Sequence, residues 1–106
     1  MATQEAIIKT ILIERDYQDK KWGKDRKHEI PTWFLILRKE LDEAEEAWLK
    51  KGDEEAIIEL SQVVAVGIAC MEQHGAINRF TGDKFKKAMI LSDDYIDPVV
   101  SIVRPS

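Results

Sequence analysis

Four side chains with metal-binding chemistry stand in two pairs along the sequence. Glu40 and Glu43 enclose the segment ELDE, and after fifteen intervening residues Glu59 and Gln62 enclose the segment ELSQ. Residues three positions apart lie on the same face of a helix, so each pair would point in one direction. Hard divalent cations such as Mg²⁺ and Mn²⁺ prefer oxygen ligands. The spacing therefore predicts a cation site where two helices bring the pairs together.

The sequence around these acids predicts that some of them face inward. Glu59 begins an apolar run and aligns at helical spacing with Val63, Val66 and Cys70. Glu40 borders the apolar stripe of its own segment, with little positive charge on that face. A buried, unpaired carboxylate is unfavourable unless it is paired, protonated or bound to a metal. A divalent cation would relieve the repulsion; the alternative is that these acids are solvated.

Three predicted helices position these residues. They cover about residues 3–21, 32–51 and 53–74, with proline in the first turn of the second, Asp53 as N-cap of the third and Gly75 ending it. Short connections predict antiparallel neighbours. Residues 76–80 and 83–95 each fit a short helix, and 96–106 are typical of an extended tail. The sequence thus predicts one all-α domain of packed helices over residues 1–106.

Composition narrows the class of protein. A chain of 106 residues, 44% hydrophobic and 34% charged, is typical of one folded helical domain. The net charge of −4 argues against a nucleic-acid partner. Cys70 is the single cysteine, which fits a reducing compartment. The first residues lack signal-peptide features, and the apolar run 63–71 is too short to span a bilayer, so we expect a cytoplasmic protein without membrane contact.

The order of motifs resembles a known family. ELDE, a spacer and ELSQ are similar to the ExxE, spacer, ExxD motif of the all-α NTP pyrophosphohydrolases of the MazG-like superfamily. ERDYQDKKWG and ILRKELDEAEEAW extend the resemblance over about residues 14–75. It implies a four-helix MazG fold that forms a homodimer or homotetramer. It also implies hydrolysis of a nucleoside triphosphate to the monophosphate and pyrophosphate, as house-cleaning of non-canonical or excess nucleotides.

The resemblance also assigns roles to individual residues. It implies that Glu40, Glu43 and Glu59 hold Mg²⁺ or Mn²⁺ and carry the catalysis, with Gln62 as fourth ligand. His28 and Trp33 match places that line the base pocket of dCTP pyrophosphatases, where the base stacks on the indole; otherwise a tryptophan at a helix start is a core residue.

Basic residues and the other tryptophans complete the predictions. Lys24, in the basic loop 19–29, and Lys84, in a second basic group, are candidates to bind the phosphates; the alternative is that both groups are simply solvated. Trp22 and Trp48 are predicted to be packing residues.

Gln62 departs from the motif, which has aspartate there. An amide adds no charge and cannot accept a proton, so a glutamate would have to act as the base. Lys39 also stands where many members have glutamate. Three hypotheses follow. The protein is an active pyrophosphohydrolase, or it is a catalytically silent nucleotide-binding or interaction module on the same scaffold. In the third, purely structural hypothesis the acids are surface charges and the third helix forms an oligomer interface.

Overall fold

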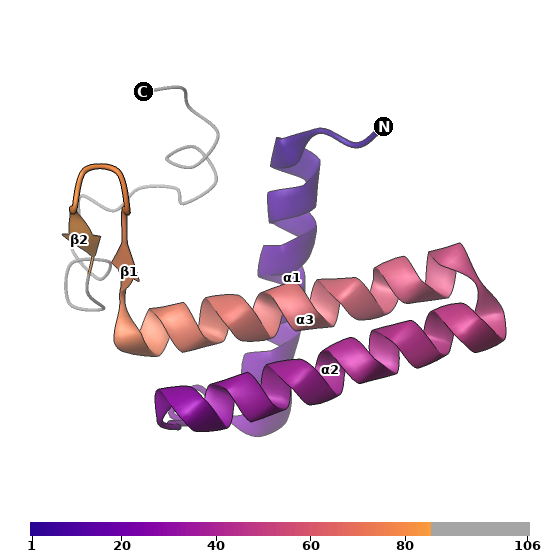
Figure 1. Ribbon diagram of the computed structural model, residues 1–106, viewed down its shortest axis with the longest axis horizontal. Helices are drawn as coiled ribbons and strands as arrows, with labels where there is room; N and C mark the ends of the chain where they lie inside the picture. The colour runs from indigo at the N-terminus through magenta and orange to yellow at the C-terminus, as the bar shows by residue number, and fades with distance from the viewer. Residues whose placement is uncertain (86–106) are drawn as a thin grey trace.

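Two long antiparallel helices pack side by side and form the largest unit of the described structure (Figure 1). The computed structural model describes residues 1–85, which form helices α1 (Gln4–Trp22), α2 (Ile30–Lys51) and α3 (Asp53–His74), then strands β1 (Ala76–Ile77) and β2 (Lys84–Phe85). All three predicted helices are present, within two residues of their expected bounds. The prediction of an all-α class is confirmed for this part of the chain.

A single residue, Gly52, connects α2 to α3. Its amide donates to the Trp48 carbonyl (3.0 Å) and ends α2, while its carbonyl accepts from Ala56 (3.2 Å) and begins α3. A turn this short needs φ of +97°, a conformation that glycine adopts without steric cost. The prediction of Asp53 as N-cap is wrong, because Gly52 serves both helices. Asp53 is the first residue of α3, and its carboxylate accepts from Trp48 Nε1 (2.9 Å).

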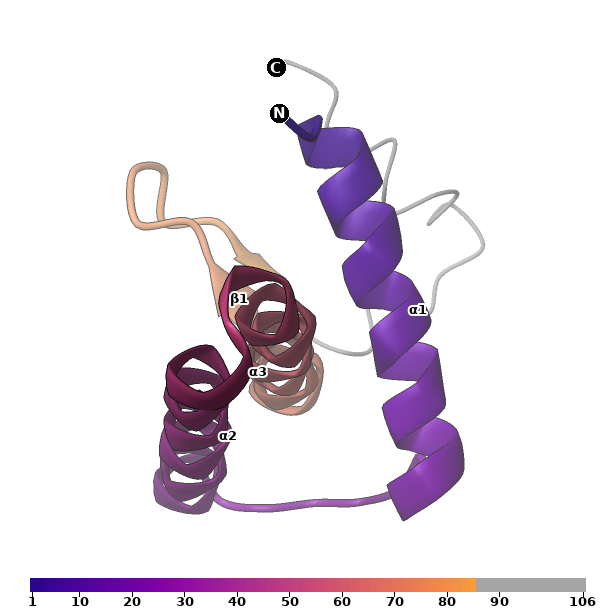
Figure 2. The same ribbon diagram turned by 90° about the vertical axis from the view of Figure 1, so that its right-hand side faces the viewer.

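Helix α1 crosses the α2–α3 pair instead of running beside it. Figures 1 and 2 show α2 and α3 side by side and α1 running crosswise against them, closer to α3. The expectation of antiparallel packing is therefore correct for α2 and α3 and wrong for α1. The connection between Trp22 and Ile30 is long enough to redirect the chain, so it does not impose an antiparallel arrangement.

The contact between α1 and α3 depends on buried polar groups. Arg15 donates to Glu72 on α3 (2.6 Å) and to Asp19 on its own helix (2.9 Å). Gln18, only 1% exposed, donates from Nε2 to the Gln62 carbonyl of α3 (3.3 Å). Buried donors without partners are costly, so these bonds fix where α1 lies on α3. The apolar core between α2 and α3 is centred on Trp33 and Val66.

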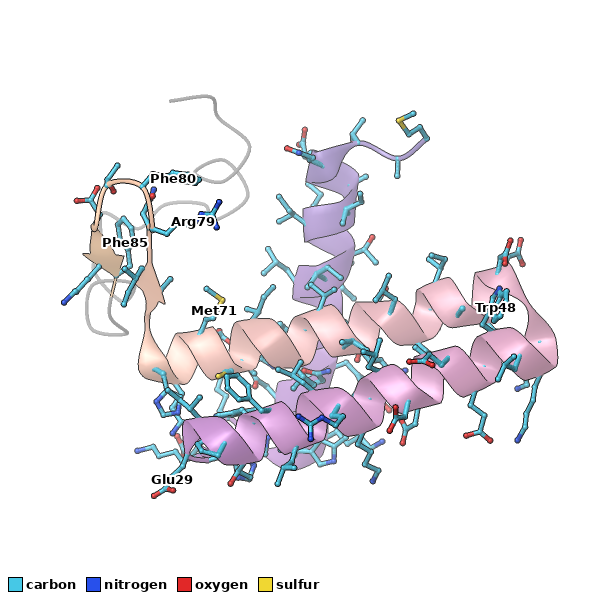
Figure 3. The ribbon with its side chains drawn as sticks, viewed as in Figure 1. Glu29, Trp48, Met71, Arg79, Phe80 and Phe85 are labelled. Atoms are coloured by element: carbon cyan, nitrogen blue, oxygen red, sulfur yellow. The ribbon has the colours of Figure 1, made fainter. Side chains whose placement is uncertain are left out.

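A short hairpin follows α3. Strands β1 and β2 are antiparallel, with Ala76 opposite Phe85 and Ile77 opposite Lys84. Figure 3 shows Phe80 and Phe85 within this hairpin. The prediction of a helix at 76–80 is wrong: the Asn78 amide donates to the Asp83 carbonyl (2.8 Å), which closes a turn. Most of the predicted fourth helix and the predicted tail lie outside the described residues.

Many apolar side chains on all three helices stay exposed. On α3 they include Ile57, Ile58, Leu60, Val64 and Met71. Trp22 and Trp48, predicted to be packing residues, are 41% and 55% exposed, and Trp48 lies beside the α2–α3 turn (Figure 3). Across residues 1–85, no helix is both long enough and apolar enough to cross a membrane.

Candidate metal centre

Three carboxylates converge between α2 and α3. Glu40, Glu43 and Glu59 each offer an oxygen atom within 4.8 Å of those of the other two. Glu40 and Glu43 are one turn apart on α2, and the antiparallel pairing carries Glu59 of α3 to the same place. The structure therefore brings together the three glutamates identified from their spacing.

The electrostatic environment of this cluster is unfavourable for three ionised acids. Burial raises the pKa of Glu40. The neighbouring Glu43 raises it further through its charge and a hydrogen bond, and so does the charge of Glu59. Lys39 opposes the shift only weakly. Two carboxylates about 5 Å apart repel by roughly 3 kcal/mol at an effective dielectric constant of 20. The metal-free cluster thus favours protonation of Glu40.

One oxygen atom of Glu40 indicates that the cluster suits a bound cation. Among residues 1–85, Glu40 Oε2 is buried and has no hydrogen-bond partner. A buried acceptor without a partner costs about 1–3 kcal/mol, which a bound cation would remove. Three carboxylates at this spacing match the oxygen preference of Mg²⁺ and Mn²⁺. The residues present therefore fit a hard divalent cation.

The raised pKa of Glu40 predicts a stability effect in the metal-free protein. The folded state binds this proton more tightly than the unfolded state, so the free energy of unfolding should fall as pH rises through the raised pKa and remain lower above it. Glu40→Gln removes the penalty and should be more stable than the wild type at neutral pH, by up to about 1 kcal/mol after solvent screening.

Urea unfolding at several pH values, with chelator present, measures this difference. Asp42→Asn is the matched control, because Asp42 is an exposed acid on the same helix and lies outside the cluster. Equal stability of wild type and Glu40→Gln across the pH range would show that Glu40 ionises without penalty.

Gln62 lies one helical turn after Glu59 and is partly buried. Its backbone carbonyl accepts from Gln18, which ties this turn of α3 to α1. Within the described residues its side-chain amide makes no hydrogen bond. The amide oxygen is thus free of protein partners, and the three acids carry all the charge of the predicted ligand set.

A fourth acid near the cluster was missed from the sequence. Burial raises the pKa of Glu14, and the charge of Glu59 raises it further. Glu14 lies on α1, one turn before Gln18, whose bond to Gln62 sets the position of α1 against α3. Only the crossing of α1 over α3 places it near Glu59. Its one signal in the sequence is its place at the start of ERDYQDKKWG.

A pocket of about 350 Å³ lies about two helical turns from the cluster along α2. It lies between the end of α1, the following loop and the first turns of α2, against the end of α3. Its walls comprise Arg15, Asp19, Gly23, Lys24, Asp25, Arg26, Lys27, Trp33, Ala69, Glu72 and Gln73. Trp33 and Glu40 are seven residues apart on one face of α2, which places them about 10 Å apart along the helix.

The pocket contains two of the four residues predicted to bind substrate. Lys24 and Trp33 line it, and His28 lies edge-on to the Trp33 ring at 4.9 Å. Trp33 is only 1% exposed and donates from Nε1 to Gln73 (2.9 Å), so its ring is a core element of the pocket wall. It offers no open face for stacking here, contrary to the expectation. The backbone amide of His28 also donates to Gln73 (3.0 Å).

Lys84 lies away from both the cluster and the pocket. It is exposed on β2, in the hairpin that follows the end of α3. Glu59 is fifteen residues before that end, about 22 Å along the helix. The structure does not bring Lys84 together with the other predicted substrate-binding residues.

Comparisons of the chain with known protein families, with curated proteins and with solved structures find no match. The chemistry of the site must therefore be argued from its own residues. These are a three-glutamate cluster with one unpartnered buried oxygen, and a pocket with several charged residues in its wall, about two helical turns from the cluster along α2.

Proposed function

We propose that the protein is a Mg²⁺- or Mn²⁺-dependent pyrophosphohydrolase that converts a nucleoside triphosphate to its monophosphate and pyrophosphate. The observation that supports this most is the convergence of Glu40, Glu43 and Glu59 around a buried oxygen without a partner. The type of reaction is inferred from the resemblance of the ELDE and ELSQ motifs to those of the MazG-like pyrophosphohydrolases. The pocket about two helical turns away would supply a place for the part of the nucleotide that does not contact the metal.

The glutamates would share two tasks. Glu40, Glu43 and Glu59 would hold the cation, which supplies charge neutralisation at the phosphate oxygens. A water molecule attacking phosphorus must lose a proton, and the Gln62 amide cannot accept it. One of the carboxylates must therefore take the proton, and Glu14 is an additional candidate because it lies within the electrostatic reach of Glu59.

The pocket would hold the nucleoside monophosphate portion. Lys24 lines it, and Trp33 with His28 forms its rigid wall. The separation of about 10 Å along α2 between Trp33 and Glu40 is on the scale of an extended nucleotide. The pyrophosphate portion would then reach the cluster while the nucleoside remains in the pocket.

A panel of canonical and modified nucleoside triphosphates, assayed for pyrophosphate with Mg²⁺ or Mn²⁺, tests the proposal. We expect release from at least one nucleotide, none with chelator, and a monophosphate as the second product. The absence of turnover across the panel by folded, metal-loaded protein would refute it.

Gln62 favours a second candidate, a catalytically silent nucleotide-binding or interaction module. Gln62→Asp adds a fourth charge to the ligand set, and we expect about tenfold tighter Mn²⁺ binding by calorimetry, because cation affinity follows the charge count of the ligands. Gln62→Asn is the matched control, since it has the same shape as aspartate without the charge. A silent wild type that still binds nucleotide, with activity only in Gln62→Asp, would select the second candidate.

The exposed apolar side chains support a homo-oligomer. Ile57, Ile58 and Leu60 lie exposed on α3, and Phe34 and Leu35 on α2, so a second copy would cover apolar surface that the single chain leaves in water. Light scattering on purified protein distinguishes a homodimer or homotetramer from a monomer.

A further inference from the structure

Some of the charged side chains around the pocket form ion pairs and others do not. Three acids and four cations line it, but two of the acids, Asp19 and Glu72, are both bound by Arg15. None of the ion pairs formed within residues 1–85 involves the three remaining cations, Lys24, Arg26 and Lys27. The third acid, Asp25, is exposed. The pocket therefore presents an excess of unpaired positive charge.

Arg26 is the most firmly placed of these cations. Its guanidinium carbon lies 4.9 Å from the centre of the Trp22 ring and 4.9 Å from that of Trp33. Burial and the nearby Arg15 lower its pKa, opposed by the charges of Asp19 and Glu40. Arginine stays charged under such shifts. The side chain is thus a partly buried cation held against two aromatic rings, within electrostatic reach of the carboxylate cluster.

This placement leaves one kind of contact open to Arg26. The contacts with the two rings do not use the N–H donors of the guanidinium, so hydrogen-bond partners can still approach those groups. In the part of the chain that the structure describes, no side-chain hydrogen bond from Arg26 is formed. A planar guanidinium with open edges suits an oxyanion that accepts two parallel hydrogen bonds.

We infer that Arg26, held against Trp22 and Trp33, is the binding residue for a phosphoryl group in this pocket. Arg26 lines the pocket against Trp33, which stands about two helical turns before Glu40 on α2, and this place suits the α-phosphoryl group of a nucleotide whose pyrophosphate portion reaches the carboxylate cluster. This choice of phosphoryl group rests on the proposed function. Binding of the anion itself does not require hydrolysis or a metal, so it can be tested separately.

Titration of the chelator-treated protein with inorganic phosphate, pyrophosphate and nucleoside monophosphates tests the inference. Tryptophan fluorescence should report binding, because the Trp22 and Trp33 rings both contact Arg26. We expect Arg26→Gln to weaken binding at least about tenfold, because it removes a charged donor. Arg26→Lys should weaken it about threefold or more, since an ammonium group cannot form the paired bonds. Acetate should bind far more weakly than phosphate.

Lys9→Gln is the matched control, since it removes one positive charge from an exposed site on α1 and should leave affinity within about twofold of wild type. Thermal unfolding shows whether each variant is folded. In wild-type protein the Arg26 Nε–Hε resonance should shift on addition of pyrophosphate, a readout that needs no variant. An unmoved resonance, equal affinity in Arg26→Gln, or no anion binding by wild type would overturn the inference. Loss of hydrolysis alone would refute only the proposed reaction.

Discussion

Replacing Glu59 with glutamine is expected to lower pyrophosphate release at least about a hundredfold. Loss of a group that only supports a ligand typically costs 10- to 100-fold, so loss of a charged ligand should cost at least the upper end of that range. Glu59 is the one carboxylate of the cluster that comes from α3, and glutamine keeps its length while removing its charge. Steady-state assays at saturating Mg²⁺, with the best nucleotide of the panel, measure the loss.

Glu45→Gln provides the control for this experiment. Glu45 is an exposed acid of α2 outside the cluster, so its replacement changes the net charge equally and should leave the rate within about twofold. Calorimetry with Mn²⁺ should show weaker binding in Glu59→Gln only. Unchanged activity in Glu59→Gln would exclude the cluster as the catalytic centre.

Replacing Trp33 with alanine is expected to destabilise the protein by about 3–5 kcal/mol. A buried tryptophan replaced by alanine leaves a large cavity, and Trp33 is 1% exposed in the centre of the core with Val66 and Ala69. The change also removes the bond from its Nε1 to Gln73. Urea unfolding followed by circular dichroism measures the loss without relying on tryptophan fluorescence.

Trp48→Ala is the control variant, because it removes the same side chain from an exposed position and so separates the effect of burial on stability. Trp48 is 55% exposed, and among residues 1–85 its side chain bonds only to Asp53, so its loss should cost about 1 kcal/mol. Trp33→Phe should fall between the two variants, because it keeps most of the packing and loses the hydrogen bond. Similar losses for Trp33→Ala and Trp48→Ala would contradict the placement of Trp33 in the core.

The carboxylates proposed to bind the metal also lower the stability of the metal-free fold. Burial and the like charges of Glu43 and Glu59 raise the pKa of Glu40 and destabilise the metal-free fold above that pKa. Binding of a cation to the folded state alone would offset this cost by mass action. Functional sites are often places where a protein gives up stability, and Glu40 with its unpartnered oxygen has the properties of such a place.

The helices and the cluster could be predicted because their signals are local. Gly52 and Gly75 mark helix ends. Glu40 and Glu43 share a face through helical geometry alone. Once α2 and α3 are antiparallel neighbours, a one-residue turn at Gly52 leaves little freedom in how Glu59 meets them.

The parts that could not be predicted depend on contacts between distant segments. The crossing of α1 is fixed by Arg15 with Glu72 and by Gln18 with Gln62, pairs far apart in the sequence whose partners have no periodic signal. Glu14 comes near Glu59 only through that crossing. Arg26 lies in a loop of mixed charge, where nothing in the sequence distinguishes it from its lysine neighbours.

A crystal structure of the protein soaked in Mn²⁺, with an anomalous-scattering map, tests most simply whether the three glutamates bind a metal. We predict a single strong peak in coordination contact with the carboxylates of Glu40, Glu43 and Glu59, and no such peak in Glu59→Gln crystals. A wild-type map without a peak at this place, or one in which the three side chains point apart, would contradict the central claim that this cluster is a metal centre.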